Sequence, residues 1–177
     1  MRRGPAVALA VAVAWVVPGA PAGGADTEPA AACRFRAEFD MTPGLSLTPT
    51  SGAFTSGGET GMIMCSGPVD GRMVTGPGTF GAEGNYGTAD GDSCVSGGEG
   101  SAVQSFTLPT RDGALPVRSV IMFAYQPVPG PGSVALASGQ FEGERFSGTF
   151  DVTLIEGDCV TRPVTRVRLD GRGMLRS

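Results

Sequence analysis

The feature that most constrains the fold is an alternation of apolar and polar residues with a period of two. In residues 33–41 apolar side chains alternate with charged ones, and the segments 146–154 and 166–169 show the same alternation. This period is that of a β-strand with one face in the core and the other in solvent. Long helices are excluded because the chain contains 29 glycines and 14 prolines.

Turn signals separate these segments. Asp-Gly and Gly-Gly pairs tolerate the positive φ of tight hairpin turns, and they occur at Gly57-Gly58, Asp70-Gly71, Asp90-Gly91, Asp112-Gly113 and Asp170-Gly171. Between the turns the pattern predicts about eight strands. Their expected ranges are 33–41, 59–67, 77–86, 94–108, 117–126, 133–141, 145–156 and 160–169.

The segment 117–126 also has apolar residues at helical spacing. It is short, rich in β-branched and aromatic residues, and bounded by Pro116 and Pro127. Because regular helices usually need more length, we interpret it as a strand buried on both faces. Strands that follow one another in a meander favour closure, since a closed barrel exposes no edges. The predicted fold is therefore all-β, a single antiparallel up-and-down barrel.

The N-terminal segment has the pattern of a secretory signal peptide. Arg2 and Arg3 precede an apolar run from Ala6 to Val17, and small residues suited to cleavage follow. The run is too short to span a bilayer. We expect a signal peptide at 1–25, a short disordered segment at 26–32 and a β-barrel domain at 33–177. The protein is expected to be secreted and extracellular, without stable membrane insertion after cleavage.

Export makes the four cysteines informative. Cys33, Cys65, Cys94 and Cys159 are even in number, match no zinc-binding spacing, and suit two disulfides in an oxidising compartment. In an up-and-down meander successive connections lie at alternate ends of the barrel, and bonded cysteines must share an end. Of the three pairings, this topology prefers Cys33–Cys65 with Cys94–Cys159.

Composition excludes several kinds of chemistry. The chain has no histidine, so imidazole metal ligation and histidine-dependent triads are absent. Its net charge of −4 argues against nucleic-acid binding. The sequence identifies no catalytic residue, no metal site and no cofactor, and it does not determine the oligomeric state. The late arginines 162, 166, 168 and 172 are expected to pair with acidic neighbours across the sheet, with contact to an anionic ligand as the alternative.

The barrel interior is the remaining candidate site. Small eight-stranded barrels are either filled by side chains or hold one small ligand. Aromatic residues at inward positions are the candidate lining, and glycines opposite them favour a cavity. These residues are Phe35, Phe39, Tyr86, Phe106, Phe123, Tyr125, Phe141 and Phe150, with Phe146 beside them.

Several Gly-rich motifs resemble one family. The segments 65–71, 76–87, 139–150 and 157–161, which include Cys65, Cys94 and Cys159 in or near them, are similar to secreted actinobacterial proteins of the allene-oxide-cyclase-barrel-like type. The resemblance implies a calycin-like barrel that holds an apolar small molecule, as allene oxide cyclases and dirigent proteins do. The catalytic carboxylate and water-binding asparagine of those proteins match no position here. The chain's one asparagine is Asn85.

These observations predict a secreted β-barrel that binds an apolar small molecule or lipid in its interior. Two alternatives stay open. One is an isomerase or cyclase acting inside the barrel, which needs an inward-facing carboxylate. The other is a cell-surface interaction module or secreted protease inhibitor, for which the Pro-Gly-rich loop 127–132 is the candidate contact.

Overall fold

A computed structural model describes residues 30–88, 90–127 and 136–177. The expected signal peptide at 1–25, residues 26–29 of the expected disordered segment and nearly all of the loop 127–132 lie outside these residues. The described residues contain strands and connections but no helix, and hence no helix long and apolar enough to cross a membrane.

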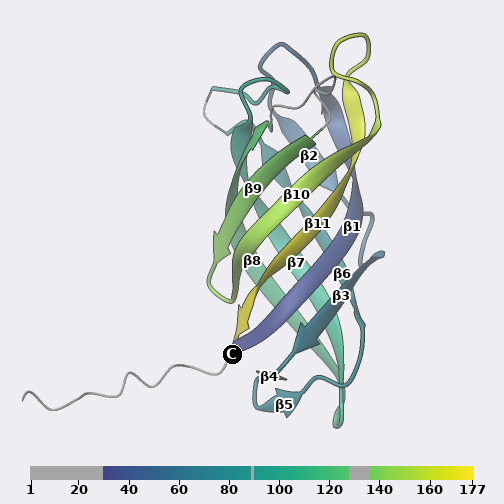
Figure 1. Ribbon diagram of the computed structural model, residues 1–177, viewed down its shortest axis with the longest axis vertical. Coiled ribbons are helices and arrows are strands. Elements are labelled where there is room, and N and C mark those ends of the chain that lie inside the picture. The colour runs from purple at the N-terminus through teal and green to yellow at the C-terminus, as the bar shows by residue number, and fades with distance from the viewer. Residues whose placement is uncertain (1–29, 89, 128–135) are drawn as a thin grey trace, which may run out of the picture.

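The strands close into an antiparallel barrel (Figure 1). From β6 (Gly78–Tyr86) to β11 (Val164–Arg176) each strand pairs with the next one along the chain, and β11 pairs with β1 (Ala30–Leu45). Two short strands, β2 (Gly52–Thr55) and β3 (Gly61–Ser66), each pair with both β1 and β6 and together fill the place between them. Eight positions therefore surround the axis, and the predicted up-and-down barrel is confirmed. The strands are β1 (Ala30–Leu45), β2 (Gly52–Thr55), β3 (Gly61–Ser66), β4 (Pro68–Val69), β5 (Arg72–Met73), β6 (Gly78–Tyr86), β7 (Gly98–Thr110), β8 (Gly113–Pro127), β9 (Leu136–Gly143), β10 (Phe146–Glu156) and β11 (Val164–Arg176).

Three short strands were not predicted. β2 lies in the connection after β1 and pairs with β1 and β6, whereas β4 and β5 form a separate hairpin at the lower end of the barrel in Figure 1. The turn of this hairpin is Asp70-Gly71, where both residues have positive φ, as the sequence indicated. Strands of two to four residues show too few alternations for a periodic pattern to reveal them.

The first and last strands of the barrel begin earlier and end later, respectively, than expected. β1 begins at Ala30, so residues 30–32 belong to a strand and not to a disordered segment. They pair with Met174, Leu175 and Arg176 of β11, which passes through Asp170-Gly171 without turning. The turn predicted there is wrong. A Cβ at Gly171 would overlap the ring of Phe35 on the neighbouring strand, so glycine makes room for an aromatic ring at this position.

The prediction that 117–126 is buried on both faces is also wrong. The segment is a strand, but its burial alternates: Ser119 and Ile121 are buried, while Val120 and Met122 are 57% and 60% exposed. No second layer of described residues covers the outside of the barrel, so apolar residues at outward positions remain in contact with solvent.

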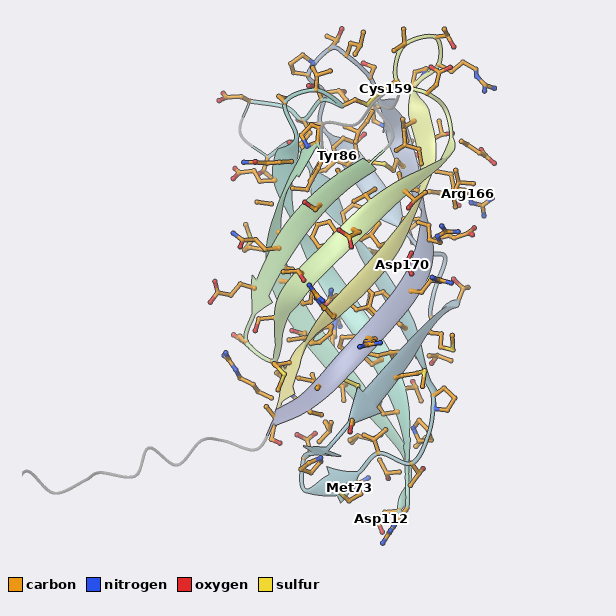
Figure 2. The ribbon with its side chains drawn as sticks, in the orientation of Figure 1. Met73, Tyr86, Asp112, Cys159, Arg166 and Asp170 are labelled. Carbon is orange, nitrogen blue, oxygen red and sulfur yellow. A yellow bond between two sulfur atoms is a disulfide. The ribbon has the colours of Figure 1, made fainter. Side chains whose placement is uncertain are left out.

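Both predicted disulfides are present. Cys33 and Cys65 are directly opposite each other in the β1–β3 pair. Cys94 and Cys159 connect two loops at the other end of the barrel, labelled by Cys159 at the top of Figure 2. The alternating ends of a meander thus identified the correct pairing.

The outer surface carries the late arginines. Arg166 on β11 lies within 4 Å of carboxylate oxygens of Glu38, Asp40 and Glu156 on the two flanking strands. Arg168 pairs with Asp170 on its own strand. Pairing with acidic neighbours across the sheet is therefore confirmed for Arg166, whereas the partner of Arg168 is on its own strand. Figure 2 shows Arg166 and Asp170 on the outer side of the ribbon.

Candidate ligand-binding cavity

The interior of the barrel is filled in its lower half. Five phenylalanines make a ring cluster there, which we call the phenylalanine cluster: Phe35, Phe80, Phe106, Phe141 and Phe146. Ring centroids lie 4.6 Å apart for Phe35–Phe80, 4.9 Å for Phe141–Phe146 and 5.2 Å for Phe106–Phe146. These are the separations at which aromatic pairs attract each other most. Leu108, Leu175 and Ile63 pack around the cluster with no exposed surface.

The upper half is hollow. A cavity of about 110 Å³ lies above the phenylalanine cluster, which forms its floor through Phe35, Phe80 and Phe141. Its walls include three alanines at inward strand positions, Ala82, Ala102 and Ala137. Alanine side chains fill little volume. The same strands whose side chains pack against one another in the lower half therefore leave space in the upper half. The lining is almost entirely apolar.

Seven of the eight aromatic residues predicted as lining border this cavity, whereas Phe106 does not. Phe106 has no exposed surface and packs between Phe80 and Phe146 in the filled half, as does Phe146 itself. Phe106 does point into the barrel, as the alternation of apolar and polar residues predicted. The alternation does not indicate at which height along the barrel axis a residue lies. The prediction of Phe106 as a lining residue is therefore corrected by its position near the lower end of β7. The seven residues that do border the cavity are Phe35, Phe39, Tyr86, Phe123, Tyr125, Phe141 and Phe150.

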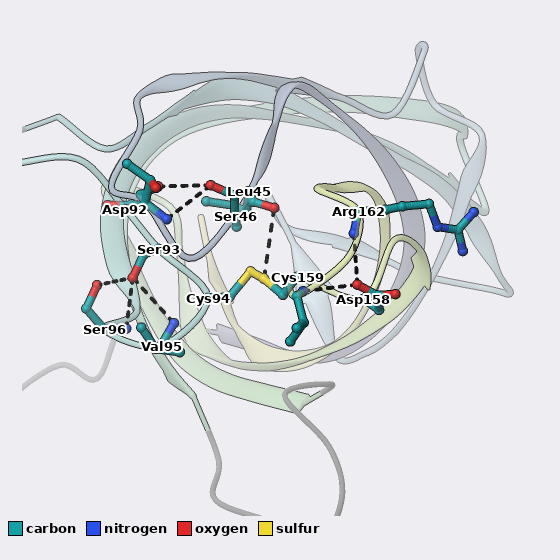
Figure 3. The surroundings of a disulfide bond; sticks show 12 residues. Leu45, Ser46, Asp92, Ser93, Cys94, Val95, Ser96, Asp158, Cys159 and Arg162 are labelled. Atoms are coloured by element: carbon teal, nitrogen blue, oxygen red, sulfur yellow. Dashed lines mark hydrogen bonds between the residues drawn. A yellow bond between two sulfur atoms is a disulfide. The ribbon is translucent and has the colours of Figure 1, made fainter.

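Three segments meet over the upper mouth (Figure 3). The Cys94–Cys159 disulfide spans the inside of the ring of strands and connects the β6–β7 loop with the β10–β11 loop. The Cys94 N–H donates to the Ser46 carbonyl at 3.0 Å, which ties the segment after β1 to the same place. Leu45 and Cys94 both line the cavity, so this closure is part of its wall.

A buried carboxylate supports the rim. Asp92 is 2% exposed, and its Oδ1 and Oδ2 accept hydrogen bonds from the Glu99 N–H at 3.2 Å and from the Tyr125 hydroxyl at 3.3 Å. Burial raises the pKa of Asp92 above its usual value, against the opposing effect of these hydrogen bonds. Asp92 does not border the cavity. Its role in this geometry is to hold the β6–β7 loop and the Tyr125 ring in place.

The two tyrosines border the cavity with their rings and turn their hydroxyls to protein acceptors. Tyr86 donates to the Pro43 carbonyl and Tyr125 to Asp92. Burial, and secondarily the negative charge of Asp92, raises the pKa of both phenols. Both therefore stay neutral and act as apolar walls toward the cavity.

Sequence reasoning missed two buried polar residues here. Asp92 directly follows the predicted Asp90-Gly91 turn, and no local pattern marks it as buried. Gln104 is 3% exposed and lines the cavity. The sequence contained a signal for Gln104. It lies two residues from Phe106 on the strand predicted at 94–108, so both side chains should point into the barrel.

Residues for other chemistry are not gathered in the described part of the chain. Six glutamates could in principle do acid–base work, at 59, 83, 99, 142, 144 and 156. They are exposed except for Glu59, which is half-buried and accepts a hydrogen bond from Thr79. None lines the cavity. Among residues 30–88, 90–127 and 136–177 no three acidic or cysteine side chains are grouped as metal ligands.

Comparison of the chain with protein-family models, with curated proteins and with solved structures found no match. The resemblance to the allene-oxide-cyclase-barrel-like type therefore stays a prediction. Function has to be argued from the cavity, because a barrel architecture by itself implies no activity.

Proposed function

We propose that this protein is secreted and binds a small, uncharged, apolar molecule in the hollow half of its barrel. The observation that carries the proposal is the contrast within one interior: the lower half is filled by side chains, whereas the upper half keeps about 110 Å³ of apolar space under a disulfide-closed rim. Apolar cavities of about 150 Å³ stay dry and accept molecules the size of benzene.

The charge of the lining supports an uncharged ligand. Among the residues that the structure describes, no arginine, lysine, aspartate or glutamate borders the cavity. An ionised group would lose its hydration there without gaining a partner, which is strongly unfavourable. The sequence predicted an apolar small molecule or a lipid, and the uncharged lining argues against a lipid with an ionised carboxylate. It favours neutral ligands the size of one ring or a short chain.

The lining also favours binding over catalysis. A cyclase or isomerase acting inside the barrel needs a carboxylate that reaches its substrate, and the buried Asp92 is hydrogen-bonded behind Tyr125. The alternative of a protease inhibitor rests on the loop 127–132, most of which lies outside the described residues. Secretion is supported by the signal pattern and is compatible with two disulfides.

Methyl NMR with toluene tests the binding proposal residue by residue. Toluene should shift the methyl resonances of Ala102, Ile121 and Val152, which line the cavity, and leave those of Leu108 and Leu175 in the filled half in place. Shifts spread evenly over both sets, or no shifts up to the solubility of toluene, would contradict the proposal. The mass of the protein recovered from culture medium tests secretion, since cleavage near residue 25 removes the leader.

Tyrosine fluorescence is a second, independent readout. The chain has two tyrosines and one tryptophan, and both tyrosines border the cavity. In the variant Trp15→Phe the emission comes from Tyr86 and Tyr125 whether or not the leader is cleaved. A saturable change on adding toluene is expected, with the same midpoint as the NMR titration.

A further inference from the structure

The boundary between the filled and hollow halves carries two polar side chains with unused hydrogen-bonding capacity. Gln104 on β7 and Ser119 on β8 are each 3% exposed and directly opposite each other in the β7–β8 pair. Gln104 lines the cavity, and Phe106, two residues further along β7, belongs to the phenylalanine cluster. Ser119 does not border the cavity, so Gln104 is the member of the pair that a ligand in the cavity can reach.

Neither side chain is satisfied within the protein. Gln104 Oε1 and Ser119 Oγ are buried without a hydrogen-bond partner. Buried polar atoms in folded proteins are nearly always paired, because an unpaired one loses its hydration without compensation. The other polar groups at the cavity wall differ in this respect, since the hydroxyls of Tyr86 and Tyr125 donate to Pro43 and Asp92.

We infer that the ligand of the cavity carries a hydroxyl group, which donates a hydrogen bond to Gln104 Oε1 while its apolar body fills the space above. This rests on the proposed function and narrows its ligand class. The glutamine Oε1 can only accept a hydrogen bond, and a hydroxyl group of the ligand can donate one to it. One ligand group therefore satisfies the buried oxygen at the cavity wall. The ligand class is thus a small neutral alcohol or phenol.

Phenol and toluene make a matched pair of probes, because they differ by a hydroxyl in place of a methyl group. Calorimetric titration gives both dissociation constants for the wild type and for the variant Gln104→Leu, which keeps the size of the side chain and removes the acceptor. The ratio Kd(toluene)/Kd(phenol) should fall about tenfold or more in the variant, the effect expected for an unpaired buried polar atom. Toluene is more hydrophobic than phenol, but this difference affects the ratio equally in the wild type and in the variant, so it does not affect the comparison.

The matched control is Gln140→Leu, which makes the same change on the outer face of β9, where Gln140 is exposed. It should leave the ratio at its wild-type value. A ratio that Gln104→Leu also leaves unchanged overturns this inference while the cavity remains a binding site. If neither phenol nor toluene binds the wild type, the proposed function itself fails.

Stability of the ligand-free protein gives a readout that does not depend on the choice of probe. Removing an unpaired buried amide should raise the Tm of Gln104→Leu by about 2–4 °C. Saturating phenol should raise the Tm of the wild type more than that of the variant. A variant that melts below the wild type without ligand would show that Gln104 has a structural partner, which overturns the inference.

Discussion

The two halves of the barrel are built from the same strands and the same residue types, yet one is solid and the other is hollow. Below, phenylalanine rings meet at centroid distances of 4.6–5.9 Å, and Val69 of the β4–β5 hairpin closes the end without exposed surface. Above, Ala82, Ala102 and Ala137 occupy inward positions among the aromatic rings, and a disulfide closes the end. A barrel can thus separate stability from binding along its axis, because the side chains at each height decide whether the interior is filled.

Truncating a ring in the filled half should have the largest effect. Phe106→Ala removes a fully buried ring from the phenylalanine cluster, and we expect a loss of about 3–5 kcal/mol in the free energy of unfolding. Phe123→Ala, at a half-buried ring that already borders the cavity, should cost about 1–2 kcal/mol. Chemical denaturation measures both. Equal losses would mean that the two halves are packed alike.

The two disulfides should contribute similarly to the free energy of unfolding but differ in their effect on the rate of ligand exchange. Replacing either pair by alanines should cost about 2–4 kcal/mol, because each crosslink closes a long loop: the sequence separation is 32 for Cys33–Cys65 and 65 for Cys94–Cys159. Only Cys94→Ala with Cys159→Ala opens the upper mouth. Toluene exchange measured by NMR should become faster in that variant, whereas Cys33→Ala with Cys65→Ala should retain the wild-type rate.

Enlarging an alanine should have opposite consequences in and away from the cavity. Ala102→Leu fills part of the hollow half, so we expect a gain of about 0.5–2 kcal/mol and loss of toluene binding. Ala37→Leu adds the same atoms at a buried position outside the lining, where Gly61 approaches closely, and should cost about 1–3 kcal/mol. Destabilisation by Ala102→Leu would show that the cavity cannot accommodate added atoms.

The smallest effect concerns pH and compares two aspartates near the upper mouth. The pKa of Asp92 is raised by burial, so the folded state holds that proton more tightly, and stability from Asp92 increases as pH falls through its folded pKa toward 3.8. The pKa of Asp158 is lowered, first by the hydrogen bond from the Thr161 hydroxyl and then by backbone N–H groups, so its contribution is lost as pH falls below 3.8.

Unfolding curves of Asp92→Asn and Asp158→Asn across this pH range separate the two contributions. Relative to wild type, Asp92→Asn should become less stable as pH falls toward 3.8, whereas Asp158→Asn should become relatively more stable below 3.8. Parallel curves for wild type and Asp92→Asn would contradict the burial of an ionisable Asp92.

The sequence by itself determined the fold class, most strands and the disulfide pairing, because these follow from local periodicity and from the alternating ends of a meander. It predicted a strand at 117–126 and a turn at Asp112-Gly113, and both are present. It did not determine that β11 continues through Gly171, because the ring of Phe35 that requires this glycine comes from a strand more than a hundred residues away.

Tertiary structure alone decided which inward residues fill the barrel and which surround a cavity. Phe106 and Phe123 both point into the barrel, yet Phe106 is in the packed cluster and Phe123 borders the cavity. Their heights along the axis depend on strand register and tilt, which arise from pairing between all eight positions of the barrel. The same register places Gln104 and Ser119 opposite each other at the boundary and buries Asp92 behind Tyr125. No segment of the chain carries that information locally, because it exists only once the barrel is closed.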